Sequence, residues 1–267
     1  MARIIAICLQ KGGTGKTVST VNLAAALAKH HKQRVLITDM DPQGNVSQAL
    51  GLNLENIEKT VLDLLQDSRL PARNVLIHAR NNIDVVPSNV MLSTAEVELV
   101  SKPYSERLLA KHISALEGDY DFILIDTPPN LGILTVNALA SSREVVIPID
   151  VSVFSIKALT PLAHLINQVA EGEERMFILH PIITGFRERQ VHDRNIRDMV
   201  EDLMPDMMLP PIPHTTVVRQ AIAQGKTLFE LDTTNPATLA YARAAKELYN
   251  RGLERVGGLQ DDQEIQG

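Results

Sequence analysis

The sequence has no tryptophan, and aromatic residues make up only 3% of its 267 positions. Hydrophobic residues make up 45%, so the core must be built from Ile, Leu, Val and Ala. Those side chains suit a mostly parallel sheet that is covered by helices on both faces. No internal repeat or proline-rich linker divides the chain. We therefore expect a single domain over residues 1–256, followed by a disordered polar tail over 257–267.

Cysteine and long hydrophobic runs are also scarce. The single cysteine, Cys8, excludes a disulfide framework, and its apolar surroundings predict a buried, unreactive thiol. The N-terminal residues "MARIIAICLQ" are too short for a signal peptide, and no stretch approaches ~20 uninterrupted apolar residues. We therefore expect a cytoplasmic protein. The net charge of −6 leaves only a local basic face for any contact with nucleic acid.

Short apolar runs alternate with helical patterns along most of the chain. Strands are predicted at 3–9, 34–38, 74–79, 83–88, 122–126, 144–149 and 176–184. Helices are predicted at 16–29, 104–117, 132–141, 155–171, 192–203 and 236–256, the last of which begins with a proline. This alternation predicts an α/β fold with right-handed crossovers and a mostly parallel, twisted sheet.

A glycine-rich stretch, "LQKGGTGKT" at residues 9–17, joins the first predicted strand to the first predicted helix. It resembles the phosphate-binding P-loop, except that Gln10 stands where the first glycine usually lies. Glycines let backbone N–H groups approach phosphate oxygens, and the helix adds the positive end of its dipole. Lys16 is placed to reach the β- and γ-phosphates, and Thr17 to bind Mg²⁺. The residues expected to contact the nucleotide are Lys11, Gly12, Gly13, Thr14, Gly15, Lys16, Thr17 and Val18.

Carboxylates follow two other predicted strands. Asp126 ends "FILID", which is the arrangement that holds Mg²⁺ opposite a P-loop. Asp39 and Asp41 follow "RVLIT" and lie two residues apart, so their side chains point the same way on an extended chain. In a parallel sheet these strand ends and the P-loop emerge at one edge. We predict a nucleotide and magnesium site there.

Three motifs together, "KGGTGKT", "DMDPQGN" and "DTPPNLG", resemble the deviant Walker A and switch motifs of the ParA/MinD family of P-loop ATPases. The similarity is strongest to the short ParA/Soj type, in which Gln10 is usual, and it extends from residue 2 to about 250. It implies that Lys11 crosses an ATP-dependent homodimer to touch the partner's nucleotide. It also implies that Asp41 positions the attacking water, while Asp39 and Asp126 support the metal. Val18 departs from the family, which usually has a second threonine there.

The resemblance further implies a function in moving cargo over DNA. ParA-like ATPases bind non-specific DNA as ATP-bound dimers on the nucleoid and are released by a ParB-like or cargo-adaptor activator. The candidate DNA contacts here are Arg187, Arg189, Arg194, Arg197 and Arg219. Glu188, Asp193, Asp198 and Glu201 interleave with them, so an ordinary ion-paired surface is the competing interpretation. By the same resemblance, Pro213 and His214 are candidates for contacting adenine.

Two other functions compete with DNA partitioning. A MinD-like positioning ATPase would bind the membrane, but the C-terminal helix presents Ala, Leu and Tyr and is followed by acidic residues, which disfavours membrane contact. A small-molecule ATP-dependent enzyme with the same loop would need a substrate pocket that the sequence does not reveal. Partitioning or cargo positioning, with ATP and Mg²⁺ as cofactors, is therefore the preferred interpretation.

Overall fold

The structure is a computed structural model that describes residues 1–264, with the side chains of Leu54 and residues 254–264 left aside. Within these residues, eight strands form one sheet in the order β3-β4-β2-β5-β1-β6-β7-β8. Neighbouring strands run parallel, except that β3 is antiparallel to β4. The strands are β1 (Arg3–Ile7), β2 (Val35–Asp39), β3 (Ile77–Arg80), β4 (Ile83–Val86), β5 (Phe122–Asp126), β6 (Glu144–Asp150), β7 (Ile178–Phe186) and β8 (Leu209–Pro213).

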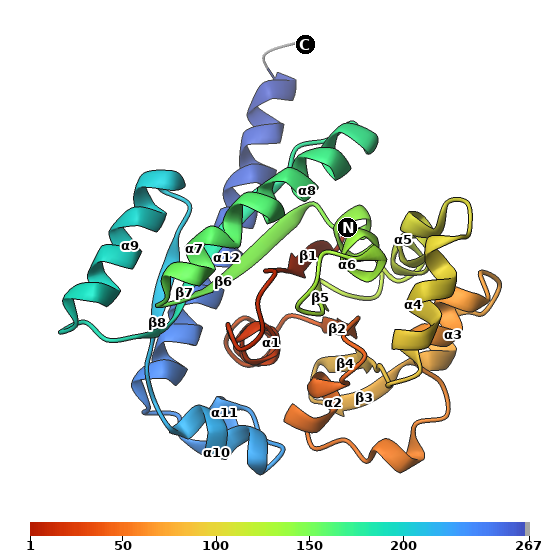
Figure 1. Cartoon of the computed structure of the whole chain (residues 1–267), viewed down its shortest axis with the longest axis horizontal. Helices are drawn as coiled ribbons and strands as arrows, with labels where there is room; N and C mark the ends of the chain where they lie inside the picture. Colours follow the sequence, from red (N-terminus) through yellow and green to blue (C-terminus); the bar gives the residue numbers. More distant parts are fainter. Residues whose placement is uncertain (265–267) are drawn as a thin grey trace.

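Helices cover both faces of this sheet (Figure 1). One face carries α1 (Lys16–His31), α2 (Asn45–Ala49), α10 (Val217–Ala223), α11 (Leu228–Leu231) and α12 (Pro236–Glu264). Helices α3 (Val61–Gln66), α4 (Leu92–Val100), α5 (Leu108–Ser114), α6 (Ile133–Ser141) and α8 (Leu159–Gly172) pack on the other. Short α7 (Val153–Lys157) follows β6, and α9 (Val191–Leu203) packs beside β7. The predicted α/β class is thus confirmed, and the core is aliphatic as the composition required.

The C-terminal helix differs from the predicted boundary. It begins at Pro236 as expected, but α12 runs to Glu264, so the polar tail predicted for 257–267 is helical over residues 257–264. Gln260, Gln263 and Glu264 have good helix propensity, and the sequence over 257–264 has no proline that would end the helix. Residues 265–267 lie outside the described residues. No helix in the described part of the chain is long and apolar enough to cross a membrane.

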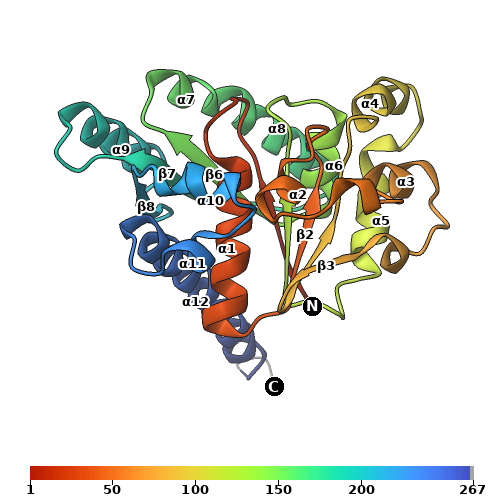
Figure 2. The same cartoon turned by 90° about the horizontal axis from the view of Figure 1, so that it is seen from below.

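The register of the central strands brings the predicted site together. Ile7 at the end of β1 and Asp39 at the end of β2 both pair with Asp126, the last residue of β5. Side chains that are more than 80 residues apart in sequence therefore meet at the carboxyl edge of the sheet. Figure 2 shows α1 running along the sheet away from this edge, toward the end where both chain termini lie.

Candidate nucleotide site

The glycine loop is a rigid turn between β1 and α1. Gly13 and Gly15 have φ angles of 77° and 86°, in the left-handed region where a side chain is strained. Gly15 is the N-cap of α1, so the first backbone N–H groups of the helix face the loop. The Thr184 hydroxyl donates to the Thr14 carbonyl at 2.8 Å and fixes the loop to β7. The Thr14 side chain is buried, which leaves only its backbone for a ligand.

A cavity of about 340 Å³ opens beside this loop. Predicted contact residues line it: Gly12, Gly13, Gly15, Lys16, Thr17, Val18 and Asp41. Six other lining residues were not predicted from the sequence, namely Gln43, Asn45, Gln48, Ala49, Pro129 and Ile222. Gln43, Asn45 and Pro129 lie within the two aspartate motifs, and Gln48 and Ala49 follow in α2, so using each motif to its end and into the next helix could have found them. Ile222 lies on α10, and no sequence motif indicated that it would line a nucleotide site.

Lys16 is almost fully buried at the start of α1. Its ammonium donates to the carbonyls of Leu9 at 3.2 Å and Lys11 at 2.9 Å, and so curls back over the loop. Burial lowers the pKa of Lys16, although the charge of Asp126 opposes this. A buried ammonium with only two carbonyl partners is stabilised by an anion bound in the adjacent cavity.

Asp126 joins the end of β5 to α1. Its carboxylate accepts hydrogen bonds from Thr17 at 2.6 Å and Thr20 at 2.9 Å. Burial raises the pKa of Asp126 to about 6, against the lowering effect of the two threonine hydroxyls and Lys16. A bound cation would favour the ionised form of this carboxylate.

Asp39 and Asp41 have different environments although they lie two residues apart. The Asp39 carboxylate is fully buried and accepts backbone N–H bonds from Asp41 at 3.0 Å and Val46 at 3.2 Å. Burial, followed by the charge of neighbouring Asp126, raises the pKa of Asp39 well above its usual value. Asp41 instead lines the cavity and accepts from the Gln43 backbone at 3.0 Å. Asp39 therefore shapes the turn, while Asp41 faces the ligand space.

The donor set fits Mg²⁺ held together with a nucleotide. Within the described residues, no three His, Cys, Asp or Glu side chains gather as an all-protein metal centre. Mg²⁺ in nucleotide sites instead takes one or two protein oxygens and completes its shell with phosphate and water. The Thr17 hydroxyl beside Asp126, with the Lys16 ammonium nearby, has this composition.

Lys11 lies at the start of the same loop but is directed elsewhere. Its ammonium donates to Asp150 at 2.5 Å, Ser152 at 2.7 Å and Ser155 at 3.2 Å, all from the end of β6 and α7. Burial alone would raise the pKa of Asp150, but hydrogen bonds from Lys11 and both serines lower it overall. Lys11 is not one of the described residues that line the nucleotide cavity.

Pro213 and His214 are separate from the cavity in the described structure. Pro213 ends β8 and pairs with Phe186, and the backbone N–H of His214 donates to the Phe186 carbonyl at 2.9 Å. Neither Pro213 nor His214 is one of the described residues that line the cavity. Their contact with adenine stays a prediction from the family resemblance.

The five candidate arginines are spread over one loop and two helices rather than lying on one element. Arg187 and Arg189 are exposed between β7 and α9, Arg194 and Arg197 lie on α9, and exposed Arg219 lies on α10. Arg197 is ion-paired with Asp198 at 2.8 Å and Glu188 at 3.8 Å, and Arg194 donates to the Glu188 carbonyl. For the side chains of Arg189 and Arg219, no acidic partner lies within reach among the described residues. The ion-paired interpretation therefore describes α9 better than it describes the other arginines.

Cys8 is buried beneath the loop, and burial raises the pKa of its thiol to about 12. A thiol with that pKa is an unreactive core residue, as predicted.

A glycine loop between a buried strand and a helix, with a buried lysine and strand-end carboxylates around one cavity, defines a P-loop nucleotide-hydrolysing protein. Comparison with known proteins specifies the family. Residues 2–178 match the model of the AAA domain family. Soj of Bacillus subtilis, a sporulation initiation inhibitor protein, is 32% identical over 94% of this chain and 100% of its own length. The chromosome partitioning protein ParA of Myxococcus xanthus is 34% identical over 94% of this chain and 89% of its own.

Among solved structures, cobyrinic acid a,c-diamide synthase from Mycobacterium smegmatis, with bound ADP and magnesium, superposes with a TM-score of 0.80. It is 26% identical and covers 93% of this chain and 94% of its own. The chain belongs to the AAA domain family and, within it, to the ParA/Soj type of deviant-Walker-A P-loop ATPases.

Proposed function

We propose that this protein is a DNA-partitioning or cargo-positioning ATPase that works as an ATP-dependent dimer. One observation carries the proposal: the chain has two loop lysines, and only one serves its own cavity. Lys16 lies buried against the loop, while Lys11 points away to Asp150 and two serines. A charge that is not used by its own nucleotide is available for the nucleotide of a second subunit.

ATP and Mg²⁺ are the proposed ligands of the cavity. The relative with bound ADP and magnesium supports this choice, as does the fit of Thr17 and Asp126 to a magnesium-assisted phosphate site. When bound, the metal would neutralise charge on the phosphates. The loop amides and Lys16 would hold the phosphates, and Asp41 would orient a water at the open side of the cavity.

Lys11 in this scheme supplies charge from the partner subunit. Its ammonium must leave Asp150, and the cost of separating that ion pair is offset only by a new anionic partner. The phosphates of the facing subunit are such a partner, so dimerisation depends on ATP. After hydrolysis, departure of the free phosphate removes charge that holds Lys11, so that Lys11 returns to Asp150 and the dimer separates.

DNA is the proposed surface that the ATP-bound dimer binds. The named function of the ParA relative, chromosome partitioning, supports this, together with exposed Arg189 and Arg219. A dimer presents two copies of each arginine, so it makes more contacts with DNA phosphates than a monomer does. Contacts with phosphates do not depend on the base sequence. A ParB-like or cargo-adaptor activator completes the cycle, and the protein is then associated with the nucleoid.

The test is binding of a random DNA duplex by gel mobility shift at low salt. We expect binding with ATP and Mg²⁺, little with ADP, and a steep loss of affinity as salt increases. Arg219→Ala should weaken binding, whereas Arg143→Ala, an exposed arginine elsewhere, should not. If ATP gives no binding at low salt, DNA partitioning is refuted.

Two parallel assays separate the alternatives. Co-sedimentation with anionic liposomes would indicate a MinD-like positioning ATPase. Turnover that rises with a small metabolite, and not with DNA, would indicate an enzyme closer to the cobyrinic acid synthase. We expect neither result.

A further inference from the structure

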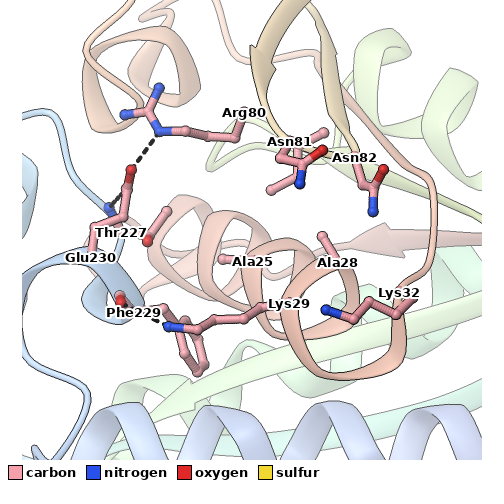
Figure 3. Close-up of a pocket in the computed structure, with 11 residues that line it drawn as sticks. Ala25, Ala28, Lys29, Lys32, Arg80, Asn81, Asn82, Thr227, Phe229 and Glu230 are labelled. Atoms are coloured by element: carbon pink, nitrogen blue, oxygen red, sulfur yellow. Dashed lines mark hydrogen bonds and ion pairs between the residues drawn. The ribbon is translucent and has the colours of Figure 1, made fainter.

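A second cavity lies at the opposite end of α1 from the P-loop. It has a volume of about 290 Å³, between the end of α1, the β3–β4 hairpin and α11 (Figure 3). Lys29, which lines this cavity, is 13 residues after Lys16 on one continuous helix. At about 1.5 Å per residue, the two sites are roughly 20 Å apart along the helix axis. The nucleotide site does not use any of the residues in this cavity.

Basic and amide side chains surround the cavity, together with one acidic side chain, Glu230. Figure 3 shows Lys29 and Lys32 on one side and Arg80, Asn81 and Asn82 on the other. Arg80 is already paired, since it donates to Glu230 at 2.7 Å and to the Gly225 carbonyl at 2.9 Å.

The two lysines differ from Arg80. Lys29 makes one long hydrogen bond, 3.3 Å, to the Phe229 carbonyl, and neither lysine has a carboxylate partner within the described residues. Two like charges three residues apart repel one another, and an anion between them would relieve the repulsion.

The floor of the cavity is apolar. Ala25 and Ala28 present only methyl groups, and they leave a shallow hollow on α1 between the two polar rims (Figure 3). Ile83 and the Phe229 ring complete this surface. An apolar floor under a polar rim is typical of a small-molecule site, where the floor binds the body and a few polar groups fix the head. The volume is at the lower end of the range for such sites, so the ligand is small.

We propose that this cavity binds a small organic anion, with its phosphate or carboxylate group between Lys29 and Lys32 and a flat apolar body over Ala25, Ala28 and Phe229. The asparagine amides of the hairpin line the same rim and would hydrogen-bond a polar substituent at the edge of the body. The proposal does not depend on DNA binding or on dimerisation, because all of its residues belong to one chain and lie away from the nucleotide.

Phenyl phosphate is a suitable probe, because it combines an anionic head with a flat ring. Its binding can be followed by ligand-observed NMR on the full-length protein with saturating Mg-ADP, which fills the P-loop and excludes the probe from that site. We expect binding, weaker binding of inorganic phosphate and of phenol, and an affinity about tenfold lower in the Lys29→Gln/Lys32→Gln double variant. Lys246→Gln is the matched control, since this exposed lysine lies on α12 outside the cavity.

Both lysines are exposed, so the double variant should fold, and its melting temperature by circular dichroism verifies this. The proposal is overturned if phenyl phosphate does not bind, if phenol binds equally well, or if the folded double variant and Lys246→Gln bind it alike.

Discussion

Two lysines five positions apart in the sequence have opposite surroundings in the structure. Lys16 begins α1 and lies under the loop, whereas Lys11 precedes the glycines and reaches the end of β6. The difference comes from the left-handed turns at Gly13 and Gly15, which reverse the chain between them. At the scale of single residues, the loop therefore places the Lys16 ammonium beside the nucleotide cavity of its own chain. It directs the Lys11 ammonium away from that cavity.

Lys16→Ala tests the first of these charges. Without the ammonium, the cavity keeps its backbone amides but loses its buried positive group, so ATP affinity should fall by at least about 100-fold. Titration with a fluorescent ATP analogue measures this loss, and Lys246→Ala on α12 serves as the control. A dissociation constant within about threefold of wild type would contradict the role of Lys16.

At the scale of elements, the strand ends were predictable and the contacts between distant segments were not. β5 matches its predicted range of 122–126, because a buried apolar run ending in aspartate has few alternatives. Helices α3 and α4 were not predicted, and α4 lies in a region, 66–103, with no clear period. Their positions depend on packing against the other face of the sheet, which a local pattern does not contain.

One such contact joins α2 to α10 through two glycines. A Cβ on Gly225 would lie 2.5 Å from the Gly51 Cα, and both glycines have φ angles near 60°. Gly225→Ala should therefore cost about 2–4 kcal/mol in the free energy of unfolding and move Ile222 away from the nucleotide cavity. Urea denaturation measures this loss. Gly118→Ala, where a Cβ meets nothing within 4 Å, should change stability little, and equal effects of both substitutions would refute the account.

A second contact ties three strands together at the amino edge of the sheet. Glu144 on β6 is paired with Arg3 on β1 at 2.6 Å and with His180 on β7 at 2.8 Å, and His180 in turn meets Arg251 of α12. Burial alone would raise the pKa of Glu144, but these partners lower it to about 2. A carboxyl with a lowered pKa stabilises the fold above its unfolded pKa, and this stability is lost as the pH falls toward 2.

Glu144→Gln should therefore destabilise the protein in a pH-dependent way. From the shift between 4.5 and about 2, the deficit in unfolding free energy is about 3 kcal/mol at pH 6 and about 1 kcal/mol at pH 3. Denaturant titrations of variant and wild type at both pH values give the comparison. A deficit that does not change with pH would show that the carboxylate charge is not what stabilises these strands.

For the whole molecule, the sequence predicted the class of fold and most of one site because those features are local. The P-loop and the aspartate motifs are contiguous stretches, and parallel strands bring their ends to one edge. The partner of Lys11 was not predictable, since Asp150 is 139 residues away and belongs to no motif. Nor was the second cavity, which joins α1, a hairpin and α11 by packing alone. Contacts between residues that are far apart in the sequence can be identified only from the structure.

In the proposed dimer, Lys11 acts on the nucleotide of a second subunit. Mixing two inactive variants, Lys11→Ala and Asp41→Ala, tests it most directly. In a mixed dimer, the Lys11→Ala subunit keeps its own Asp41 and receives Lys11 from its partner, so one of two sites is complete.

ATP turnover of the equimolar mixture, compared with each variant alone, is the measurement. We expect turnover to recover to about a quarter of the wild-type value, because half of the dimers are mixed and each has one complete site. If Lys11 served only its own nucleotide, no mixed dimer would contain a complete site. A mixture that stays as inactive as the separate variants would refute this role of Lys11.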